Sequence, residues 1–380
     1  MNTAIVPSES TLRKRPTQPQ RGRALEVMPS ERYDDKIFTS AAAGTIADIF
    51  HANSEMVTTF AVKGILTEIT PLLDADPDVK KDDWFDWTWV RAMYQDKIWA
   101  MTQKGNTTVT YYNKDLFDQA GVAYPAGKWT QEEFVETAHK LTDPEEDQFG
   151  TWTYNWHLAV WANQGDIISP DGQKCLLAEP AAYDAIQWVA DLALKENVAP
   201  KAEQSEVFGS LNPFASGKVA TYIGGEDVLG GFIESIDSFE WGAAMIPTGK
   251  ETVGEGTSTM FPMSKSTKVL DSAWEFLKFL SGDIRAYEAM AKHGKLGIPP
   301  LKKAYDELFL GTEPRPDVKE VLAEMALYNR VWMLNVTAGA EAKTTVDQGL
   351  SLVWTGELSA KDACEELCPK LDEVLANQPR

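Results

Sequence analysis

The stretch YYNKDLFDQAGVAYPAGKWTQEEFVETAHKLTD, residues 111–143, carries the clearest structural signal in the chain. It opens with the end of a predicted strand, VTYYN at 109–113, whose β-branched and aromatic residues favour extended backbone. It closes with a predicted helix that begins at Thr130, because Thr130 and Glu133 have the spacing of a capping box. A strand that leads into a capped helix indicates an α/β unit.

The same alternation continues along the chain. Strands are predicted for VATYIGG at 219–225 and WGAAMIP at 241–247, each followed by a turn-forming residue. Helices are predicted from Pro180, which stands at a favoured first position, and over DSAWEFLKFLSGD at 271–283. Strands that alternate with helices predict the α/β fold class.

Length and charge limit the functions open to this protein. The chain has 380 residues, enough for two α/β units, and 43% of them are hydrophobic. It carries 57 acidic and 36 basic residues, a formal net charge of −21. A surface this acidic repels phosphate backbones and anionic lipid, so we expect no nucleic-acid partner. We find no apolar run of the length that a membrane span needs.

The first 24 residues, MNTAIVPSESTLRKRPTQPQRGRA, differ in composition from the rest. They are rich in proline, arginine and glutamine, so residues 1–24 are predicted to form a disordered basic tail. They hold basic residues without the apolar segment of a secretory signal.

The chain has three cysteines, at positions 175, 364 and 368. An odd number without CxxC spacing argues against a disulfide framework and against a zinc site. Cys364 and Cys368 lie one turn apart on a predicted terminal helix, and we interpret them as small buried apolar residues in preference to members of a bridge.

Signatures of catalysis are largely missing from the sequence. The four histidines show neither HxxxH nor HExxH spacing, no GxSxG motif occurs, and GEGTST at 254–259 lacks the third glycine of a dinucleotide loop. We therefore predict no catalytic residue, no metal ligand and no cofactor. A pair of carboxylates for glycoside cleavage stays open as an alternative, because 57 acidic residues always supply some pair.

The stretch TWTYNWHLAVWANQGD, residues 151–166, suggests carbohydrate binding. It places three tryptophans among asparagine, histidine and aspartate side chains. A pyranose ring has an apolar C–H face that packs on an indole, and its hydroxyls need polar partners when they are buried.

In order along the chain, several segments resemble the sugar-binding group of the extracellular solute-binding proteins of ABC importers, the group that includes maltose-binding protein. These segments are YDDKIFTSAAAGTIADIF (33–50), the stretch 111–143 quoted above, ANQGDIISPDGQK (162–174), NPFASGKVATYIGG (212–225), WGAAMIPTGK (241–250) and SKSTKVLDSAWEFLKFLSG (264–282). Their joint order and spacing are more specific than any one of them.

The resemblance implies a two-lobed, periplasmic-binding-protein-like (type II) fold with hinge crossovers. The first α/β lobe is expected to comprise residues 25–110 and 258–305, and the second lobe residues 111–257 and 306–380. Family members begin with a strand and helix that have no counterpart here, so we expect the first βα unit to be missing.

The resemblance also implies ligand-binding residues in both lobes and at the crossovers. They are His51, Asn53 and Glu55 in a first-lobe loop, Asn106 and Thr107 before the first crossover, Tyr154, Trp156 and Trp161 as an aromatic wall, Glu226 and Asp227 where maltose-binding protein has a stacking tryptophan, Gly256 and Thr257 near the second crossover, and Trp332 with Asn335 near the C-terminus. For each group the alternative role is structural, as a loop or turn residue or, for the aromatic residues, as part of the core.

The function implied by the resemblance is a substrate-binding receptor. Such a protein binds a sugar or related polyol between its lobes, closes over it, and delivers it to the membrane permease of an ABC importer without covalent chemistry. We expect a monomer in the periplasm or at the cell surface. Two alternatives stay open: a carbohydrate-active hydrolase or lyase with carboxylates in the cleft, and a degenerate relative that serves as a sensor.

Overall fold

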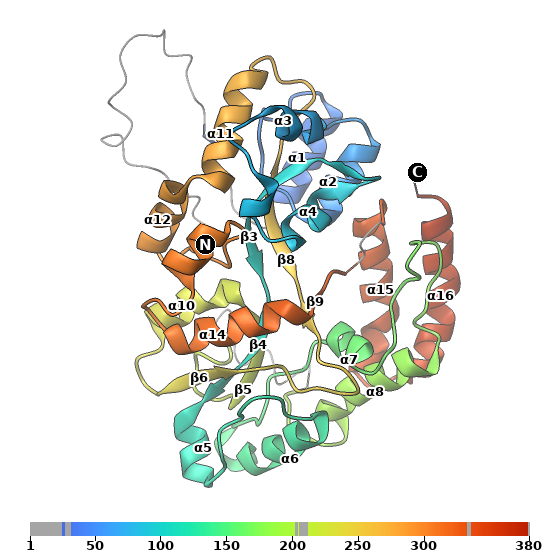
Figure 1. Ribbon diagram of the computed structural model, residues 1–380. Coiled ribbons are helices and arrows are strands. Elements are labelled where there is room, and N and C mark those ends of the chain that lie inside the picture. Colours follow the sequence, from blue (N-terminus) through green and yellow to red (C-terminus); the bar gives the residue numbers. More distant parts are fainter. Residues whose placement is uncertain (1–24, 27–31, 202–203, 205–211, 333–335, 379–380) are drawn as a thin grey trace.

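The computed structural model describes the chain except for residues 1–24, 27–31, 202–203, 205–211, 333–335 and 379–380 (Figure 1). The predicted disordered tail and the predicted site residue Asn335 therefore lie outside the described residues. Among the helices that are described, none combines the length and the apolar character needed to cross a membrane.

Helices and strands alternate along the described chain, as predicted for an α/β protein. The α-helices are α1 (Tyr33–Ala42), α2 (Ser54–Val62), α3 (Thr70–Ala75), α4 (Trp87–Ala92), α5 (Lys114–Ala120), α6 (Gln131–Leu141), α7 (Trp156–Ala162), α8 (Pro180–Leu194), α10 (Leu229–Ser235), α11 (Leu270–Gly282), α12 (Ile284–Lys292), α13 (Lys302–Ala304), α14 (Pro316–Met325), α15 (Gly339–Trp354) and α16 (Ala360–Ala376). Shorter helical turns are η2 (Lys81–Asp83), η3 (Pro144–Glu146), η5 (Glu226–Val228), η6 (Tyr305–Phe309) and η7 (Ala326–Tyr328). The strands are β1 (Met93–Tyr94), β2 (Lys97–Ile98), β3 (Ala100–Asn106), β4 (Thr108–Asn113), β5 (Thr221–Gly225), β6 (Trp241–Ala244), β7 (Gly254–Glu255), β8 (Thr257–Pro262) and β9 (Asn329–Arg330).

One lobe is built around the antiparallel pair β3 and β8. Helices α4 and α11 pack against β3. The segment GTIADIF at residues 44–50 is apolar enough to suggest a strand, but this part of the chain contributes isolated bridges, from Ile49 to Met263 and, just beyond the segment, from Ala52 to Met260. We call this part of the molecule the first lobe.

The second lobe is built around a three-stranded antiparallel sheet with the order β5–β4–β6. β5 and β6 lie within their predicted stretches, and β4 covers the predicted stretch 109–113 and begins one residue earlier, so the three strand predictions are confirmed. All residues of β4 are buried, and Tyr111 at its centre packs edge-on against Phe232. A strand buried on both faces anchors the lobe next to the point where the chain enters it.

Helix α6 begins as predicted. The N–H of Glu133 donates to Oγ1 of Thr130 at 3.1 Å, and the N–H of Thr130 donates to Oε2 of Glu133 at 2.7 Å, which completes the capping box. Trp129 packs on Phe134 with 5.6 Å between the ring centroids. Local sequence alone decides this helix start.

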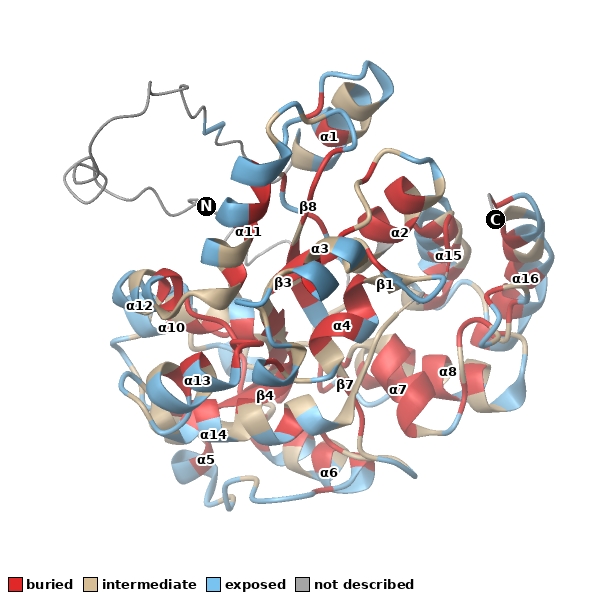
Figure 2. Cartoon of the chain, turned by 45° about the horizontal axis from the view of Figure 1, so that its top comes forward, coloured by how far each residue is buried: buried red, intermediate tan, exposed pale blue. Residues whose placement is uncertain are grey.

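The C-terminal helices α15 and α16 pack against each other and against α8, and α15 also touches α2 of the first lobe (Figure 1). Figure 2 shows α7 almost wholly buried, in agreement with Leu158, Ala159 and Val160, which have no exposed surface. These three residues anchor α7 and thereby fix the side chains at its ends.

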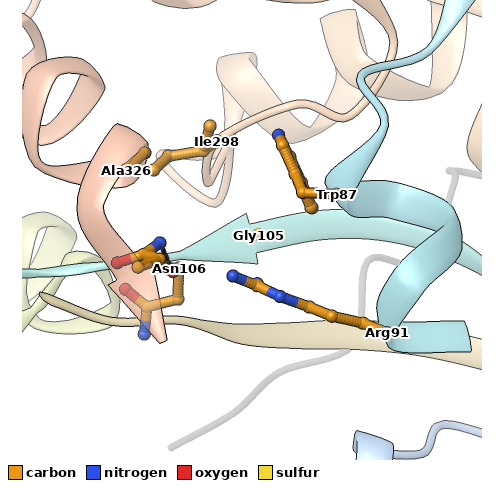
Figure 3. Close-up of a pocket in the computed structure, with 7 residues that line it drawn as sticks. Trp87, Arg91, Gly105, Asn106, Ile298 and Ala326 are labelled. Carbon is orange, nitrogen blue, oxygen red and sulfur yellow. Dashed lines mark hydrogen bonds between the residues drawn. The ribbon is translucent and has the colours of Figure 1, made fainter. Parts of the chain in front are cut away.

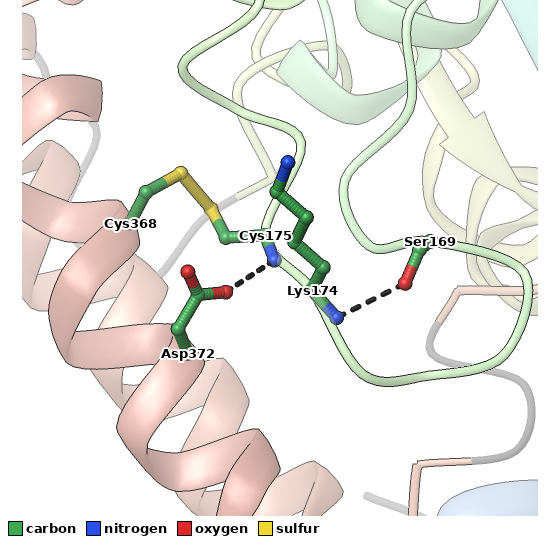
Figure 4. The surroundings of a disulfide bond; sticks show 5 residues. All are labelled: Ser169, Lys174, Cys175, Cys368 and Asp372. Carbon is green, nitrogen blue, oxygen red and sulfur yellow. Dashed lines mark hydrogen bonds between the residues drawn. A yellow bond between two sulfur atoms is a disulfide. The ribbon is translucent and has the colours of Figure 1, made fainter.

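A disulfide joins Cys175 to Cys368, while Cys364 is free and buried (Figure 4). The interpretation of Cys364 as a small buried residue is confirmed, but that of Cys368 is wrong. The backbone N–H of Cys175 also donates to Oδ1 of Asp372 at 2.6 Å, so the bridge and this bond together hold the chain before α8 to α16. Spacing could not reveal the pair, because its members lie 193 residues apart.

The two cysteine positions of α16 should respond differently to substitution. Replacing Cys175 and Cys368 together by alanine should lower the free energy of unfolding by about 2–4 kcal/mol, because the cross-link restricts the unfolded chain. Cys364→Ala should cost less, since it removes a single buried thiol. Urea unfolding measures both; equal losses would show that the bridge does not form.

Candidate ligand-binding site

Three segments meet where the chain crosses between the lobes. Strand β3 ends at Asn106 and β4 begins at Thr108; β7 is followed by β8; and β9 pairs in parallel with β7, with Glu255 opposite Arg330. Oγ1 of Thr107 donates to Oδ1 of Asn329 at 2.6 Å, and the N–H of Glu255 donates to Oγ1 of Thr108 at 3.1 Å. These bonds tie the crossovers into one hinge.

Pleating directs Asn329 and Arg330 to opposite sides of the hinge, because successive side chains of a strand alternate. Asn329 lines a small pocket with Trp87, Arg91, Gly105, Asn106, Ile298 and Ala326 (Figure 3). The pocket holds about 190 Å³ of empty space with its open mouth included. That is less than the ~300–1,000 Å³ of typical small-molecule sites, so the pocket is a gap in the hinge packing.

Arg91 is buried on this side of the hinge and binds the first residues of β8. Its Nη1 donates to the carbonyl of Thr257 at 2.6 Å and to Oγ of Ser258 at 2.8 Å. Burial lowers the pKa of Arg91 to about 10. Gly256 leaves room for the guanidinium, since a Cβ there would stand 1.9 Å from Nη2 of Arg91. The predicted site residues Gly256 and Thr257 thus both contact Arg91.

On the other side of the hinge, Trp156, His157, Trp161 and Trp332 form a set of aromatic contacts that we call the tryptophan–histidine cluster. The rings of His157 and Trp332 stack at 5.3 Å with 20° between their planes. Trp156 meets Trp332 edge-on at 5.5 Å, and Trp161 meets His157 at 5.3 Å. Trp161 is buried, whereas Trp156 and Trp332 keep some exposed surface.

Charged side chains surround the cluster in pairs. His157 Nε2 lies 3.0 Å from Oε2 of Glu255, and Arg330 Nη2 lies 2.6 Å from Oδ2 of Asp166. The Arg330 guanidinium also lies 5.0 Å from the Trp161 ring centroid. Burial would raise the pKa of Glu255, but the hydrogen bond and charge of His157 outweigh it and lower that pKa.

One buried polar atom of the cluster lacks a hydrogen-bond partner in the described structure. Nε1 of Trp332 is buried and has no hydrogen-bond partner among the described residues. A buried donor without an acceptor costs about 1–3 kcal/mol. An acceptor from a bound molecule would recover that energy, so this atom is a candidate contact to a ligand.

The prediction that Tyr154 stacks on a ligand is wrong, because the side chain is buried. It is 1% exposed, its hydroxyl donates to the carbonyl of Pro247 at 2.7 Å, and its ring packs edge-on against Phe134 and Trp188. The predicted stacking residue is therefore part of the core, and Trp156, two positions later at the start of α7, carries the exposed aromatic surface.

The first-lobe residues have mixed roles. His51 is exposed, and its carbonyl accepts a hydrogen bond from the hydroxyl of Tyr33 at 2.8 Å. Asn53 caps α2, because its Oδ1 accepts the N–H of Met56 at 2.8 Å. Glu55 lies in the first turn of α2, and its side chain is outside the description.

Asn106 connects the lobes beside Glu226 and Asp227. Its Oδ1 accepts the N–H of Glu226 at 2.6 Å, and its Nδ2 donates to Oδ1 of Asp227 at 3.0 Å. Oε2 of Glu226 lies 3.7 Å from Nζ of Lys104 in β3 and has no hydrogen-bond partner in the described structure. Burial, reinforced by Asp227 and opposed by Lys104, raises the pKa of Glu226 to about 7.

Sequence reasoning missed the polar half of the site: Lys104, His157, Asp166, Glu255 and Arg330. Glu255 had a recognisable signal, a carboxylate between two glycines in GEGTS, directly before the predicted site residues Gly256 and Thr257. Arg330 had none, since its role follows from pairing with a strand 75 residues away along the chain.

Alanine at Gly256 should disturb the hinge. Gly256→Ala drives a Cβ into the buried Arg91 guanidinium and should lower the free energy of unfolding by roughly 1–3 kcal/mol. Gly231→Ala in α10 is the matched control, because a Cβ there meets no heavy atom within 4 Å and alanine favours a helix. Urea unfolding measures the free energy of unfolding of both variants. Equal losses in Gly256→Ala and Gly231→Ala would contradict the close approach of Arg91 to Gly256.

Glu226 should make stability depend on pH. The folded protein holds its proton up to about pH 7, whereas the unfolded chain releases it near 4.5, so the contribution of Glu226 to stability falls as pH rises through that window. Glu226→Gln should remove this decline. The free energy of unfolding of the variant, relative to that of the parent protein, should therefore be higher at pH 8 than at pH 5 by roughly 1–3 kcal/mol. Urea unfolding at both pH values, with exposed Glu234→Gln as control, tests it; parallel pH profiles for Glu226→Gln and the parent would contradict the shift.

Comparison with known proteins places this chain in a family. Residues 25–284 match the model of the bacterial extracellular solute-binding proteins. A putative binding protein of Brucella abortus is 24% identical over 267 residues, which cover 67% of this chain and 63% of that protein. The mannitol-binding protein of Pseudomonas aeruginosa is 23% identical over 300 residues, 70% of this chain and 66% of the relative. The chain thus spans less than two thirds of the length of the first of these relatives.

Solved structures agree on the fold. An ABC substrate-binding protein of Listeria monocytogenes in complex with cycloalternan superposes with a TM-score of 0.85 at 22% identity, covering 92% of this chain and 90% of that one. A solute-binding protein of Thermotoga lettingae bound to α-D-tagatose gives a TM-score of 0.78 at 19% identity, covering 91% and 89%. The two-lobed type II fold is therefore confirmed, and because the family model matches more than half of the sequence, the chain belongs to the bacterial extracellular solute-binding protein family.

Proposed function

We propose that this protein is the substrate-binding receptor of an ABC importer, which captures a sugar, oligosaccharide or related polyol between its two lobes and closes around it. In this proposal the lobes have the boundaries given above, except that all of β4 belongs to the second lobe and all of β8 to the first. The hinge of β7, β9 and the β3–β4 crossover allows the lobes to move. Ligand capture then follows from the ligand's higher affinity for the closed arrangement.

The observation that carries the proposal is the tryptophan–histidine cluster beside the hinge. Trp156 offers a half-buried indole face, and Trp332 adds an aromatic surface with an unused N–H. An indole face suits the C–H side of a sugar ring, and a buried N–H suits a ring or hydroxyl oxygen.

The charge pattern favours a neutral ligand. Arg330 Nη2 lies 2.6 Å from Oδ2 of Asp166, so this cation beside the cluster already has an anionic neighbour. Relatives are named for mannitol and for arabinooligosaccharide, and others for sn-glycerol 3-phosphate. An anionic ligand would have to displace an existing carboxylate, so we favour the uncharged class.

The remaining parts of the proposal concern partners and place. The receptor acts as a monomer, performs no covalent chemistry and delivers its ligand to a membrane permease; nucleic acid is no partner of so acidic a chain. It works in the periplasm or at the cell surface. The disulfide supports that location, because such bonds persist in oxidising compartments.

A thermal-shift screen tests the function. A ligand that binds the folded state raises the midpoint by an amount that grows as RT ln(1 + [L]/Kd). Mannitol, maltotriose and an arabinooligosaccharide form the neutral arm, and sn-glycerol 3-phosphate the anionic arm. A shift with intact sugar recovered supports the receptor; sugar cleavage supports the hydrolase alternative; and no shift in either arm counts against the proposal.

Trp332→Phe separates binding from packing. The variant keeps an aromatic ring and deletes the buried N–H, but it also loses part of the contacts of the indole with Trp156 and His157. The two effects oppose each other, so the free energy of unfolding of the ligand-free protein should change by less than about 1–2 kcal/mol. The same change should weaken binding of the ligand found in the screen by roughly 5- to 10-fold, because one hydrogen bond is lost. Urea unfolding and isothermal titration calorimetry measure the two effects.

Trp354→Phe, near the end of α15 and away from the cluster, is the matched control. Its binding constant should equal that of the parent protein. Unchanged affinity in Trp332→Phe would remove this indole from the proposed site.

A further inference from the structure

The two lobes also touch away from the hinge, through a hydrogen bond between Thr59 and Thr337. Oγ1 of Thr59, in α2 of the first lobe, donates to the carbonyl oxygen of Thr337 at 2.9 Å. Thr337 lies just before α15, and α15 packs against α2. Helix α2 follows the loop that holds His51 and Asn53, so this contact lies close in sequence to the predicted first-lobe ligand residues.

Thr337 is held on its other side by Gln378. The backbone N–H of Thr337 donates to Oε1 of Gln378 at 2.9 Å, and its hydroxyl donates to the same oxygen at 3.3 Å. Nε2 of Gln378 donates to the carbonyl of Gly172 at 2.7 Å. The Gln378 amide is buried, 7% exposed, and both its oxygen and its nitrogen have partners.

Gly172 belongs to a tight turn that is fixed to the C-terminal helix. The turn closes with bonds from the N–H of Gly172 to the carbonyl of Ser169 and from the N–H of Ser169 to that of Lys174, both at 2.8 Å. The disulfide then ties the turn to α16 through Cys175 and Cys368 (Figure 4). The turn thus meets the C-terminal segment twice, at Cys368 and at Gln378.

These contacts form a continuous series from the disulfide to the first lobe. We propose that Gln378 is a positioning residue for lobe closure: anchored by the disulfide-tethered turn, it holds Thr337 where Thr59 of the opposite lobe can bond to it. This role concerns contact between the lobes, and it bears on ligand capture only through the receptor function proposed above. When Gln378 holds Thr337 in place, the hydrogen bond from Thr59 stabilises the closed arrangement. A ligand that binds only the closed arrangement then binds more tightly, by the factor by which the closed population rises.

Hydrogen exchange in the ligand-free protein tests the proposal, with mass spectrometry resolving peptides from α2 and from the segment that contains Thr337. Gln378→Met keeps the length of the side chain and removes both of its hydrogen-bonding atoms. Exchange should rise roughly 2- to 10-fold at Thr337, the factor that one hydrogen bond contributes, and also in α2. The hydrogen bonds of Gln378 within the described structure go to Thr337 and Gly172. A merely local role would therefore leave exchange in α2 unchanged, and that result would overturn the proposal.

Thr59→Val provides the second variant, from the opposite lobe. It deletes the hydroxyl with little change in shape, and it should raise exchange in both segments. Combined with Gln378→Met it should add little to the exchange of α2, because both changes break the same contact. Additive effects on α2 would show that the two residues act independently and would also overturn the proposal.

Gln348→Met and Thr344→Val are the matched controls, since both positions lie exposed on α15. Neither should alter exchange in α2. The experiment needs no ligand, so a failure of the receptor function shows as a silent sugar screen while the exchange result still decides the role of Gln378.

Discussion

The hydrogen-bonded meeting of β7 with β9 is the constraint on which the rest of this molecule depends. It brings a segment near residue 255 and a segment near residue 330 together, next to the crossover from β3 to β4. Because β-strands alternate their side chains, this single pairing sends Asn329 to the Arg91 pocket and Arg330 to the tryptophan–histidine cluster. The two sides of the hinge thereby acquire different chemistry, one packed around a buried guanidinium and one lined with aromatic rings.

Charge pairing gives the site its character. The protein is strongly acidic, with a net charge of −21. Two cations near the hinge lie beside carboxyl groups, Lys104 beside Glu226 and Arg330 beside Asp166, whereas Arg91 donates to the Thr257 carbonyl and the Ser258 hydroxyl. Neutralised pairs leave aromatic faces, amides and one unused indole N–H as the groups that a ligand can satisfy. Burial raises the pKa of Glu226, which lies beside the connection between the lobes, to about 7.

The disulfide and the hydrogen bonds of Gln378 stabilise the second lobe at the end away from the hinge. The disulfide joins the turn before α8 to α16, and Gln378 extends that anchorage to the contact with α2. Closure in this fold requires that both lobes present rigid surfaces to each other, since a contact that moves with its own loop contributes little to the closed state. In the proposed closure, the hinge and the contact between Thr59 and Thr337 act on the same movement.

The sequence by itself determined the local units. The capping box of α6, the start of α8 at Pro180 and the strands β4, β5 and β6 follow from residues within a few positions of one another, and the order of motifs carried the family and the fold class. The tertiary structure decided everything that joins distant segments: the partner of Cys368, the burial of Tyr154, and the convergence of His157, Glu255 and Arg330. Propensity and spacing act over about one turn or one strand, whereas these contacts depend on how whole elements pack, and packing is settled only when the complete chain has folded.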